Sequence, residues 1–227
     1  NDYDLFISGS DQVWSPRCVG FDPAYFLTFA DDKQKYSYAA SFAVPTLPDE
    51  FIDEYKKRLN GFQKFSVREP SGEKLVKELT GRTAETHLDP TLLISADEWK
   101  KIAVSKIDKP YILIFTANPA VSLVDFALKL SKEKNLPVYC INDAPHPVSH
   151  GINYIVAPTV EEFVGCFKNA EYVVTNSFHG TAFSVIFNKN LFVEFKNKSG
   201  RNIRSEGLLK SLGINREIVD GNCRETE

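Results

Sequence analysis

The sequence predicts an α/β protein built from two Rossmann-like lobes with parallel sheets. Short apolar runs rich in β-branched residues alternate with segments of helical periodicity along the 227 residues, as in parallel strands that are joined by crossover helices. This alternation pauses once, around residues 104–110, which we interpret as a linker. The sequence contains no internal repeat, low-complexity tract or coiled-coil heptad that would favour another architecture.

This pattern sets the expected domain boundaries. We expect an N-terminal lobe over residues 1–104, a C-terminal lobe over residues 105–200, and a closing helix with a tail over residues 201–227. The chain has no Met, and its first expected strand begins within a few residues of Asn1. We therefore expect the N-terminal lobe to be truncated at its start.

In the first lobe, short apolar runs predict the strands, and apolar residues on one helical face predict the helices. The first strand is expected to be buried. Pro70 suits the first position of a helix, where its missing amide proton is not needed. The last helix of this lobe is expected to turn Trp99 and Ile102 inward. The expected strands are residues 5–7, 36–42 and 65–67, and the expected helices are residues 49–59, 70–79 and 96–103.

In the second lobe, the helix over residues 122–134 is expected to carry an apolar stripe of Leu123, Phe126, Ala127 and Leu130. Gly213 is expected to end the last helix in the left-handed conformation. Residues 142–151 contain two prolines and are expected to form a loop. The expected strands are residues 111–115, 137–141, 172–174 and, as the last, 191–195; the expected helices are residues 122–134, 159–167, 203–212 and one that begins near His179.

Composition argues against several classes of protein. The net charge of −3 and the lack of a long basic run argue against nucleic acid as a partner. No apolar segment approaches the about 18–20 residues of a membrane span, and no signal-peptide pattern occurs. The four Cys residues stand singly, which argues against a disulfide framework or a zinc site. We therefore expect a cytoplasmic protein.

The sequence also lacks the common cofactor motifs. It has neither a Walker loop nor a GxGxxG segment, so we expect no ATP or dinucleotide cofactor. His146 and His150 lie four residues apart, but they stand in a proline-containing loop, where the spacing of metal ligands on a helix does not apply. We expect no metal site.

The segment from Thr175 to Gly180 carries the strongest indication of chemistry. Asn176 or Ser177 is the expected N-cap of a helix that follows a buried strand. His179 then stands in the first helical turn, at the carboxyl end of a strand, where ligands bind in open α/β sheets. Exposed amides there favour anions, and the positive helix end lowers the pKa of an imidazole. The alternative is that His179 only packs against the turn or caps it.

Arg68 is the second candidate. It follows the 65–67 strand, and a guanidinium so placed suits a carboxylate or a phosphate. The alternative is an ordinary ion pair with Glu69 or Glu73. Asp89 precedes a proline, and we expect it to stabilise a turn.

The remaining candidates come from two segments. A turn of small residues follows the first strand, where a ligand can approach the backbone closely; it contains Ser8, Gly9, Ser10 and Gln12. A cationic stretch that could close over a charged ligand follows the 191–195 strand; it contains Lys196, Lys198, Arg201 and Arg204. The alternatives are an ordinary turn and a solvated basic loop.

Taken in order, these segments resemble the polysaccharide pyruvyl transferase family. The resemblance spans about residues 4–218, and its closing element is the helix over residues 205–213. Each motif is short, but the ordered set is specific. The motifs are DLFISGSDQVW at residues 4–14, YAASF at 38–42, SVRE at 66–69, DPTLL at 89–93 and TNSFHG at 175–180.

The resemblance implies a fold similar to type B glycosyltransferases, with the site between the lobes. It implies transfer of the enolpyruvyl unit of phosphoenolpyruvate to sugar hydroxyls, leaving a pyruvate ketal and phosphate. By position, His179 matches the catalytic histidine and Arg68 matches an arginine that holds the anionic groups of the donor. Ser177 stands where many members have a donor-binding arginine. Lys196, Arg201 or Arg204 is a candidate to replace that charge.

We therefore expect a pyruvyl transferase that acts on a polysaccharide or glycan precursor. Asn176, Ser177 and Gly180 are expected to assist in anion binding, while His179 delivers a proton to the donor methylene or takes one from the attacking hydroxyl. A lipid-linked acceptor would bring the protein to the membrane surface. Two alternatives remain, a glycosyltransferase that uses a nucleotide sugar on the same scaffold and a non-catalytic glycan-binding relative.

Overall fold

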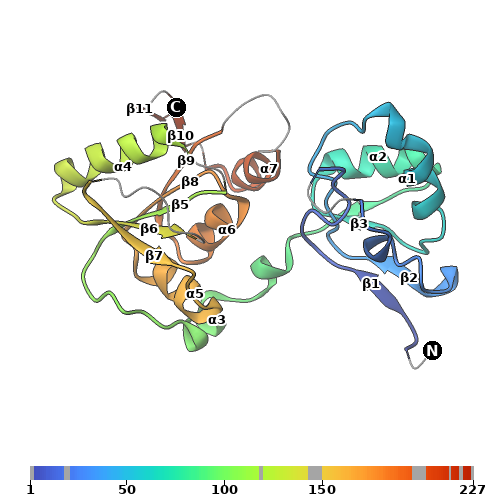
Figure 1. Cartoon of the computed structure of the whole chain (residues 1–227), viewed down its shortest axis with the longest axis horizontal. Coiled ribbons are helices and arrows are strands. Elements are labelled where there is room, and N and C mark those ends of the chain that lie inside the picture. Colours follow the sequence, from blue (N-terminus) through green and yellow to red (C-terminus); the bar gives the residue numbers. More distant parts are fainter. Residues whose placement is uncertain are drawn as a thin grey trace. The chain divides into compact units, whose positions relative to one another are not determined.

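The computed structural model describes residues 3–17, 21–117, 120–142, 150–195, 203–214, 216–219 and 222–225. The chain divides into two compact units. The first comprises Asn1–Leu93 with Asn197–Arg204, and the second comprises Ile94–Lys196 with Ser205–Glu227. Strands and helices alternate in both units (Figure 1), so the predicted α/β class is confirmed.

The first unit is built on short parallel strands. β1 pairs with β2 and β3 pairs with β4, and single parallel bridges from Tyr36 to Lys64 and from Ala40 to Val67 connect the two pairs. Because all four strands run the same way, the residues that follow them lie along one edge. The strands are β1 (Phe6–Ser8), β2 (Lys35–Ser37), β3 (Ser66–Val67) and β4 (Glu85–Thr86).

Two helices pack side by side in this unit (Figure 1). α1 (Ile52–Leu59) follows a short 3-10 turn, and α2 (Pro70–Thr80) begins at the predicted proline. Gly81, with φ of 72°, ends α2 in the left-handed conformation that glycine adopts without strain. The 3-10 turns are Pro23–Phe26, Asp32–Gln34, Asp49–Phe51 and Pro90–Leu93.

Aromatic side chains form the core of the first unit. Trp14 is fully buried, and its ring centroid lies 5.3 Å from those of Phe42 and Phe62. Its indole nitrogen donates to the Tyr25 carbonyl oxygen at 3.2 Å, which satisfies the polar atom of a buried indole. Phe26 is also fully buried. These rings therefore hold the unit together.

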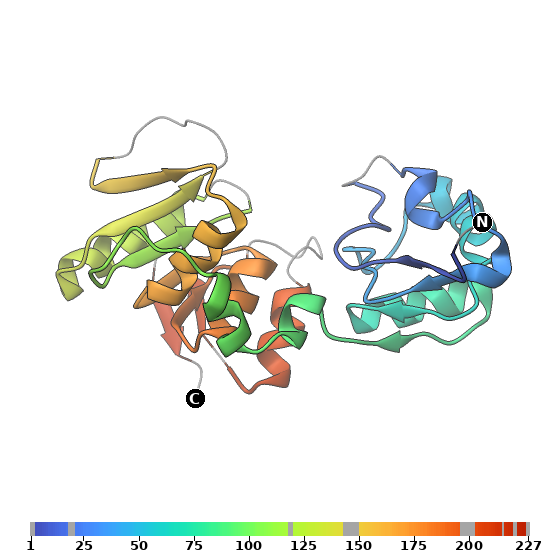
Figure 2. The same cartoon turned by 90° about the horizontal axis from the view of Figure 1, so that it is seen from below.

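The second unit contains a seven-stranded sheet in the order β11-β10-β9-β8-β5-β6-β7. Neighbouring strands run parallel, except that β11 is antiparallel to β10. Figure 2 shows β5, β6 and β7 side by side, coloured from green to yellow. The strands are β5 (Ile112–Phe115), β6 (Val138–Asn142), β7 (Ile152–Val156), β8 (Tyr172–Thr175), β9 (Asn190–Val193), β10 (Arg216–Val219) and β11 (Asn222–Glu225).

Helices cover both faces of this sheet. Ile112 and Ile114 pack with the buried stripe of α4, whereas Leu113 points to the other face and packs with residues of α5 and α6. This alternation is the period-two pattern of a buried strand. The predicted stripe of Leu123, Phe126, Ala127 and Leu130 is confirmed. The helices are α3 (Ala96–Ile102), α4 (Val121–Lys134), α5 (Val160–Asn169), α6 (Phe178–Ile186) and α7 (Ile203–Ser211).

Three local predictions for the first 104 residues are wrong. Leu5 and Ile7 are 48% and 55% exposed, so the first strand is not buried as expected. The second strand ends at Ser37 rather than residue 42, since Ala39 takes a φ of 48° and leaves the extended region. Ile102 is 43% exposed, although Trp99 does pack inward against Phe183.

The sequence also failed to predict three strands of the second unit. β7 follows directly on the expected loop, most of which lies outside the described residues. β10 and β11 follow the strand that was expected to be the last. Gly213, with φ of 67°, follows α7 as predicted.

The described residues include no helix with the length and hydropathy that a membrane crossing requires.

Two glycine-to-alanine substitutions test the packing of the second unit. A Cβ at Gly165 in α5 would overlap the Val104 carbonyl oxygen, whereas a Cβ at Gly207 in α7 meets nothing within 4 Å. We expect Gly165→Ala to lower the free energy of unfolding by about 1–3 kcal/mol. We expect Gly207→Ala to raise it by up to about 1 kcal/mol, because alanine favours a helix. Urea denaturation measures both, and equal effects of the two substitutions would contradict the packing described.

Candidate functional site

The strand order of the second unit reverses between β5 and β8. From β5 the chain adds β6 and then β7 on one side, and it returns with β8 and β9 on the other side. In an open α/β sheet, ligands bind outside the carboxyl ends of the strands at such a reversal. The residues that follow β5 and β8 are therefore the first candidates for a ligand site in this unit.

Side chains join the ends of these two strands. The Thr175 hydroxyl donates to the Phe115 carbonyl oxygen at 2.5 Å and accepts from the Ser177 amide at 3.0 Å. The Asn176 side-chain oxygen accepts from the Ala117 amide at 2.9 Å. Thr175 is fully buried and Asn176 is half-buried. These bonds fix the turn that leads from β8 into α6.

His179 stands in the first turn of α6, as predicted. Ser177 is the N-cap, and its hydroxyl accepts from the Gly180 amide at 3.4 Å. His179 is half-buried, while Phe178 before it and Gly180 after it are buried. Its ring centroid lies 5.5 Å from that of Phe178, edge to face. His179 as a residue is therefore partly accessible to solvent, and it follows the carboxyl end of β8.

Gly180 has a packing role. A Cβ at this position would overlap the Thr175 hydroxyl and lie 3.2 Å from the Phe115 ring. Only glycine therefore lets α6 begin this close to the end of β5.

Glu194 is a residue at this edge that the sequence did not single out. It follows β9, is 6% exposed, and its amide donates to the Thr175 carbonyl oxygen at 2.9 Å. The hydroxyl of Ser122, in the first turn of α4, donates to its carboxylate. A charged residue within the apolar run LFVEF was the only signal in the sequence.

In the first unit, Arg68 follows β3 and its side chain is 1% exposed. Its guanidinium donates to Asp89 Oδ2 at 2.6 Å and to Asp11 Oδ1 at 3.0 Å. The expected alternative named Glu69 or Glu73 as the ion-pair partner, and the structure shows ion pairs of Arg68 with Asp89 and Asp11. Asp11, with a 57% exposed side chain, was not predicted as a site residue.

Asp89 is the buried partner of Arg68. Its Oδ2 also accepts from the Ser10 hydroxyl at 2.8 Å, and its Oδ1 accepts from the amide and the hydroxyl of Thr91 at 3.0 and 2.8 Å. Burial alone would raise its pKa, but the hydrogen bonds from Arg68, Thr91 and Ser10 outweigh burial and lower the pKa to about 2. Asp89 stabilises a turn, as predicted, and it also neutralises a buried arginine.

The turn after β1 contributes unequally to this network. Ser10 joins it through Asp89, whereas the Ser8 hydroxyl is buried and donates to the Tyr25 carbonyl oxygen at 2.7 Å. Gly9 has open space beside it, and Gln12 is half-buried. Ser8 ends β1, Gly9, Ser10 and Gln12 follow it, and Ser10 contacts Asp89.

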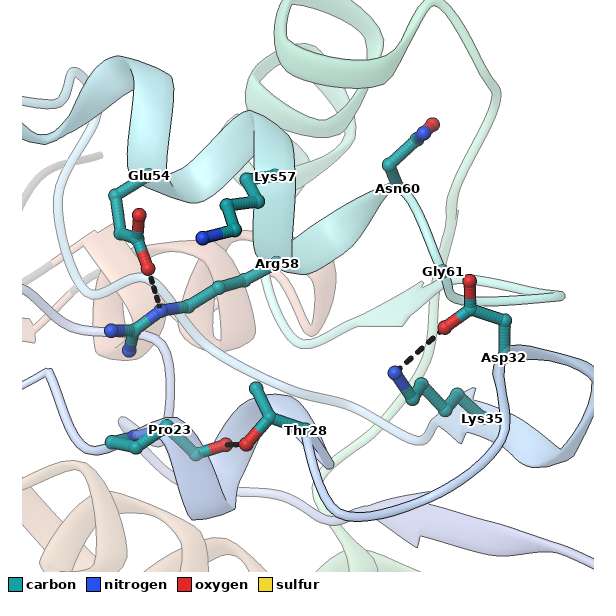
Figure 3. Close-up of a pocket in the computed structure, with 9 residues that line it drawn as sticks. All are labelled: Pro23, Thr28, Asp32, Lys35, Glu54, Lys57, Arg58, Asn60 and Gly61. Carbon is teal, nitrogen blue, oxygen red and sulfur yellow. Dashed lines mark hydrogen bonds and ion pairs between the residues drawn. The ribbon is translucent and has the colours of Figure 1, made fainter.

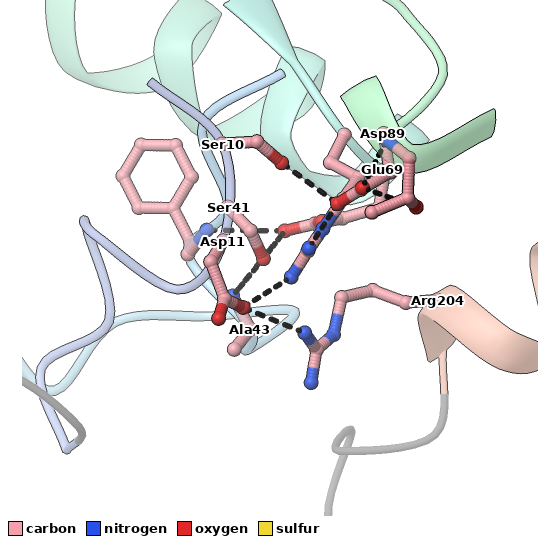
Figure 4. Close-up of polar contacts among 10 residues, drawn as sticks. Ser10, Asp11, Ser41, Ala43, Glu69, Asp89 and Arg204 are labelled. Carbon is pink, nitrogen blue, oxygen red and sulfur yellow. Dashed lines mark hydrogen bonds and ion pairs between the residues drawn. The ribbon is translucent and has the colours of Figure 1, made fainter. Parts of the chain in front are cut away.

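The predicted cationic stretch is only partly described. Lys196, Lys198 and Arg201 lie outside the described residues. Arg204 is described, and its guanidinium lies 3.6 Å from Asp11 Oδ1 (Figure 4). Arg68 belongs to the first unit and His179 to the second. Their roles at a common site stay predictions.

A pocket of about 420 Å³ lies elsewhere in the first unit (Figure 3). Lys35, which begins β2, and Gly61, which precedes β3, line it, so it lies toward the amino ends of the strands. Two of its cations have acidic partners, Lys35 with Asp32 at 2.8 Å and Arg58 with Glu54 at 2.7 Å. It is therefore remote from the strand edge that carries Arg68.

Within the part of the chain that the structure describes, no group of three or more His, Cys, Asp or Glu residues is arranged to hold a metal ion.

Comparisons with known proteins agree on the fold. The family model described as polysaccharide pyruvyl transferase matches residues 2–193. The structure is similar to UDP-GlcNAc 2-epimerase of Methanocaldococcus jannaschii in complex with UDP-GlcNAc and UDP, with a TM-score of 0.51 and 13% identity over 97% of this chain and 71% of that chain. It is also similar to a Listeria monocytogenes protein described as a UDP-N-acetylglucosamine 2-epimerase, with a TM-score of 0.53 and 12% identity over 91% and 64% of the two chains. No curated protein matches the chain.

At these identities the likeness concerns the fold alone. It confirms the predicted Rossmann-like fold, similar to that of type B glycosyltransferases.

The pH dependence of stability tests the Arg68–Asp89 pair. Because the pKa of Asp89 is lowered from 3.8 to about 2, its contribution to stability is present above about pH 4 and is lost as the pH falls toward about 2. We expect the free energy of unfolding to fall over this range in the wild type and to change less in Asp89→Asn. At pH 7 the variant should be less stable by about 3–5 kcal/mol, since Arg68 loses a buried partner. Urea denaturation between pH 2 and pH 7 measures this, and identical pH profiles would contradict it.

Proposed function

Because the chain belongs to the polysaccharide pyruvyl transferase family, we propose that it transfers a pyruvyl group from phosphoenolpyruvate to sugar hydroxyls of a polysaccharide or glycan precursor. The observation that carries this proposal is the position of His179. It is half-buried in the first turn of α6, beside the reversal of strand order between β5 and β8. A positioned imidazole can exchange protons near neutral pH.

The donor carries a carboxylate and a phosphate, and two features of the chain suit such groups. The amino end of α6, capped by Ser177 and held by Asn176, attracts anions through its amides and helix dipole. Arg68 offers a guanidinium at the strand edge of the first unit. Arg204, Lys196 and Arg201 are proposed as further donor contacts, in place of the arginine that many family members have at the position of Ser177.

In the proposed reaction, a sugar hydroxyl attacks C2 of phosphoenolpyruvate and a proton is added to C3. The product is a tetrahedral ketal phosphate with a methyl group. A second hydroxyl then attacks C2, the bond from C2 to the phosphate oxygen breaks, and the hydroxyl proton leaves with inorganic phosphate. His179 delivers the proton to C3 or takes the proton from the attacking hydroxyl.

The acceptor is proposed as a glycan with two suitably placed hydroxyls. A lipid-linked acceptor would hold the protein at the membrane surface during the reaction. We place the reaction in the cytoplasm, on the strength of the singly placed Cys residues.

Release of phosphate from phosphoenolpyruvate, in the presence of a panel of glycans, tests this function. We expect His179→Ala to lower turnover by about 10²–10⁴-fold, because a positioned acid–base group contributes this much. The half-buried position of His179 predicts that the variant keeps its fold, which circular dichroism checks. His150→Ala is the matched control, since His150 is exposed in the same unit, and it should turn over like the wild type.

Three results would contradict the proposal. Near-normal turnover of His179→Ala would remove the imidazole from the chemistry. Binding of a uridine or guanosine diphosphate sugar, with none of phosphoenolpyruvate, would favour a nucleotide-sugar glycosyltransferase. Glycan binding without phosphate release would favour a non-catalytic relative.

A further inference from the structure

Glu69 is a buried acid that the proposed reaction does not use. It follows Arg68 at the end of β3 and is 2% exposed. One of its oxygens, Oε1, accepts from the Ser41 hydroxyl at 2.9 Å, from the Phe42 amide at 3.0 Å and from the Ala43 amide at 3.2 Å. Figure 4 shows these bonds converging on the carboxyl group. A single side chain therefore satisfies three donors of one loop.

That loop has a strained backbone. Ala39 and Ala43 take φ values of 48° and 55°, in the left-handed region that residues with a Cβ rarely adopt. Such conformations persist only where the surroundings hold them. The hydrogen bonds from the Phe42 and Ala43 amides to Glu69 stabilise this conformation at the end of the loop.

The same loop positions the residues around Arg68. The Ser41 amide donates to the Asp11 carbonyl oxygen at 2.9 Å, and the Ser41 carbonyl oxygen accepts from the Trp14 amide at 3.1 Å. The Arg68 amide donates to the Ala40 carbonyl oxygen at 3.2 Å. Asp11 in turn places its carboxylate on the Arg68 guanidinium at 3.0 Å. The loop thus lies between Glu69 and the Asp11–Arg68 pair.

We propose that Glu69 is a positioning residue: through the loop over residues 39–43 it fixes the Asp11 backbone, and so it fixes how the Arg68 guanidinium is presented to the donor. The part that concerns the donor rests on the proposed function. The contacts with Ser41, Phe42 and Ala43 do not depend on it.

Glu69 acts on the loop as a hydrogen-bond acceptor through Oε1. Its second oxygen, Oε2, is buried and has no hydrogen-bond partner among the described residues. A buried carboxylate oxygen without donors disfavours the ionised form. Burial raises the pKa of Glu69, even though the Ser41 hydroxyl and the nearby Arg68 charge lower it. We expect glutamine to replace it, because its side-chain oxygen can accept the same three bonds that Oε1 accepts.

The first measurement is independent of the donor. Hydrogen exchange of the full chain, followed by mass spectrometry, reports on the backbone over residues 9–14 and 39–43. We expect Glu69→Ala to exchange at least tenfold faster in both segments, and Glu69→Gln to stay within about twofold of the wild type. An unchanged exchange rate in Glu69→Ala, or an equal increase of the rate in Glu69→Ala and Glu69→Gln, would overturn the proposal.

The second measurement uses phosphoenolpyruvate as the probe. We expect Glu69→Ala to raise the KM for phosphoenolpyruvate at least tenfold with a smaller change in kcat, and Glu69→Gln to keep the wild-type KM. Leu75→Ala is the matched control, because Leu75 is a buried core residue of the same unit with no bond to the network. If Glu69 only contributed to stability, Glu69→Ala and Leu75→Ala would change KM and kcat by similar factors when each is assayed equally far below its own melting temperature. Such agreement would overturn the proposal.

Two further outcomes separate the hypotheses. If the wild type does not turn over phosphoenolpyruvate, the proposed function fails, while the exchange data still decide the role of Glu69. If Glu69→Ala does not fold, Glu69→Asp takes its place. Its carboxyl is one methylene short of the loop, so faster exchange over residues 39–43 is expected, and wild-type exchange would overturn the proposal.

Discussion

The hydroxyl of Thr175 joins the two strands between which the strand order of the second unit reverses. It donates to the end of β5, at the Phe115 carbonyl oxygen, and accepts from the Ser177 amide where α6 begins. Because Gly180 leaves room for this hydroxyl, α6 starts at the carboxyl edge of the sheet. The position of His179 therefore follows from one buried hydroxyl and one missing Cβ.

The first unit contains a buried charge, the guanidinium of Arg68. The Arg68 side chain is 1% exposed and is held by a buried and an exposed carboxylate, those of Asp89 and Asp11. A buried charge is tolerated only where it is paired and hydrogen-bonded. The two partners therefore fix the guanidinium at the strand edge of the first unit.

Much of this arrangement could be predicted from local sequence. The strand–cap–helix pattern around Ser177 and His179 was predicted, because capping and periodicity are properties of neighbouring residues. The partners of Arg68 were not, because Asp11 and Asp89 are 57 and 21 residues away along the chain. β7, β10 and β11 were not predicted, because the formation of a short strand depends more on pairing with its neighbours than on its own residue composition.

Phosphoenolpyruvate is proposed to bind at the amino end of α6, beside His179. The most direct test is hydrogen exchange of the full chain with and without saturating phosphoenolpyruvate. We expect slower exchange over residues 175–182 on binding. Protection confined to the residues around Lys35 and Arg58, which line the pocket toward the amino ends of the strands, would contradict it.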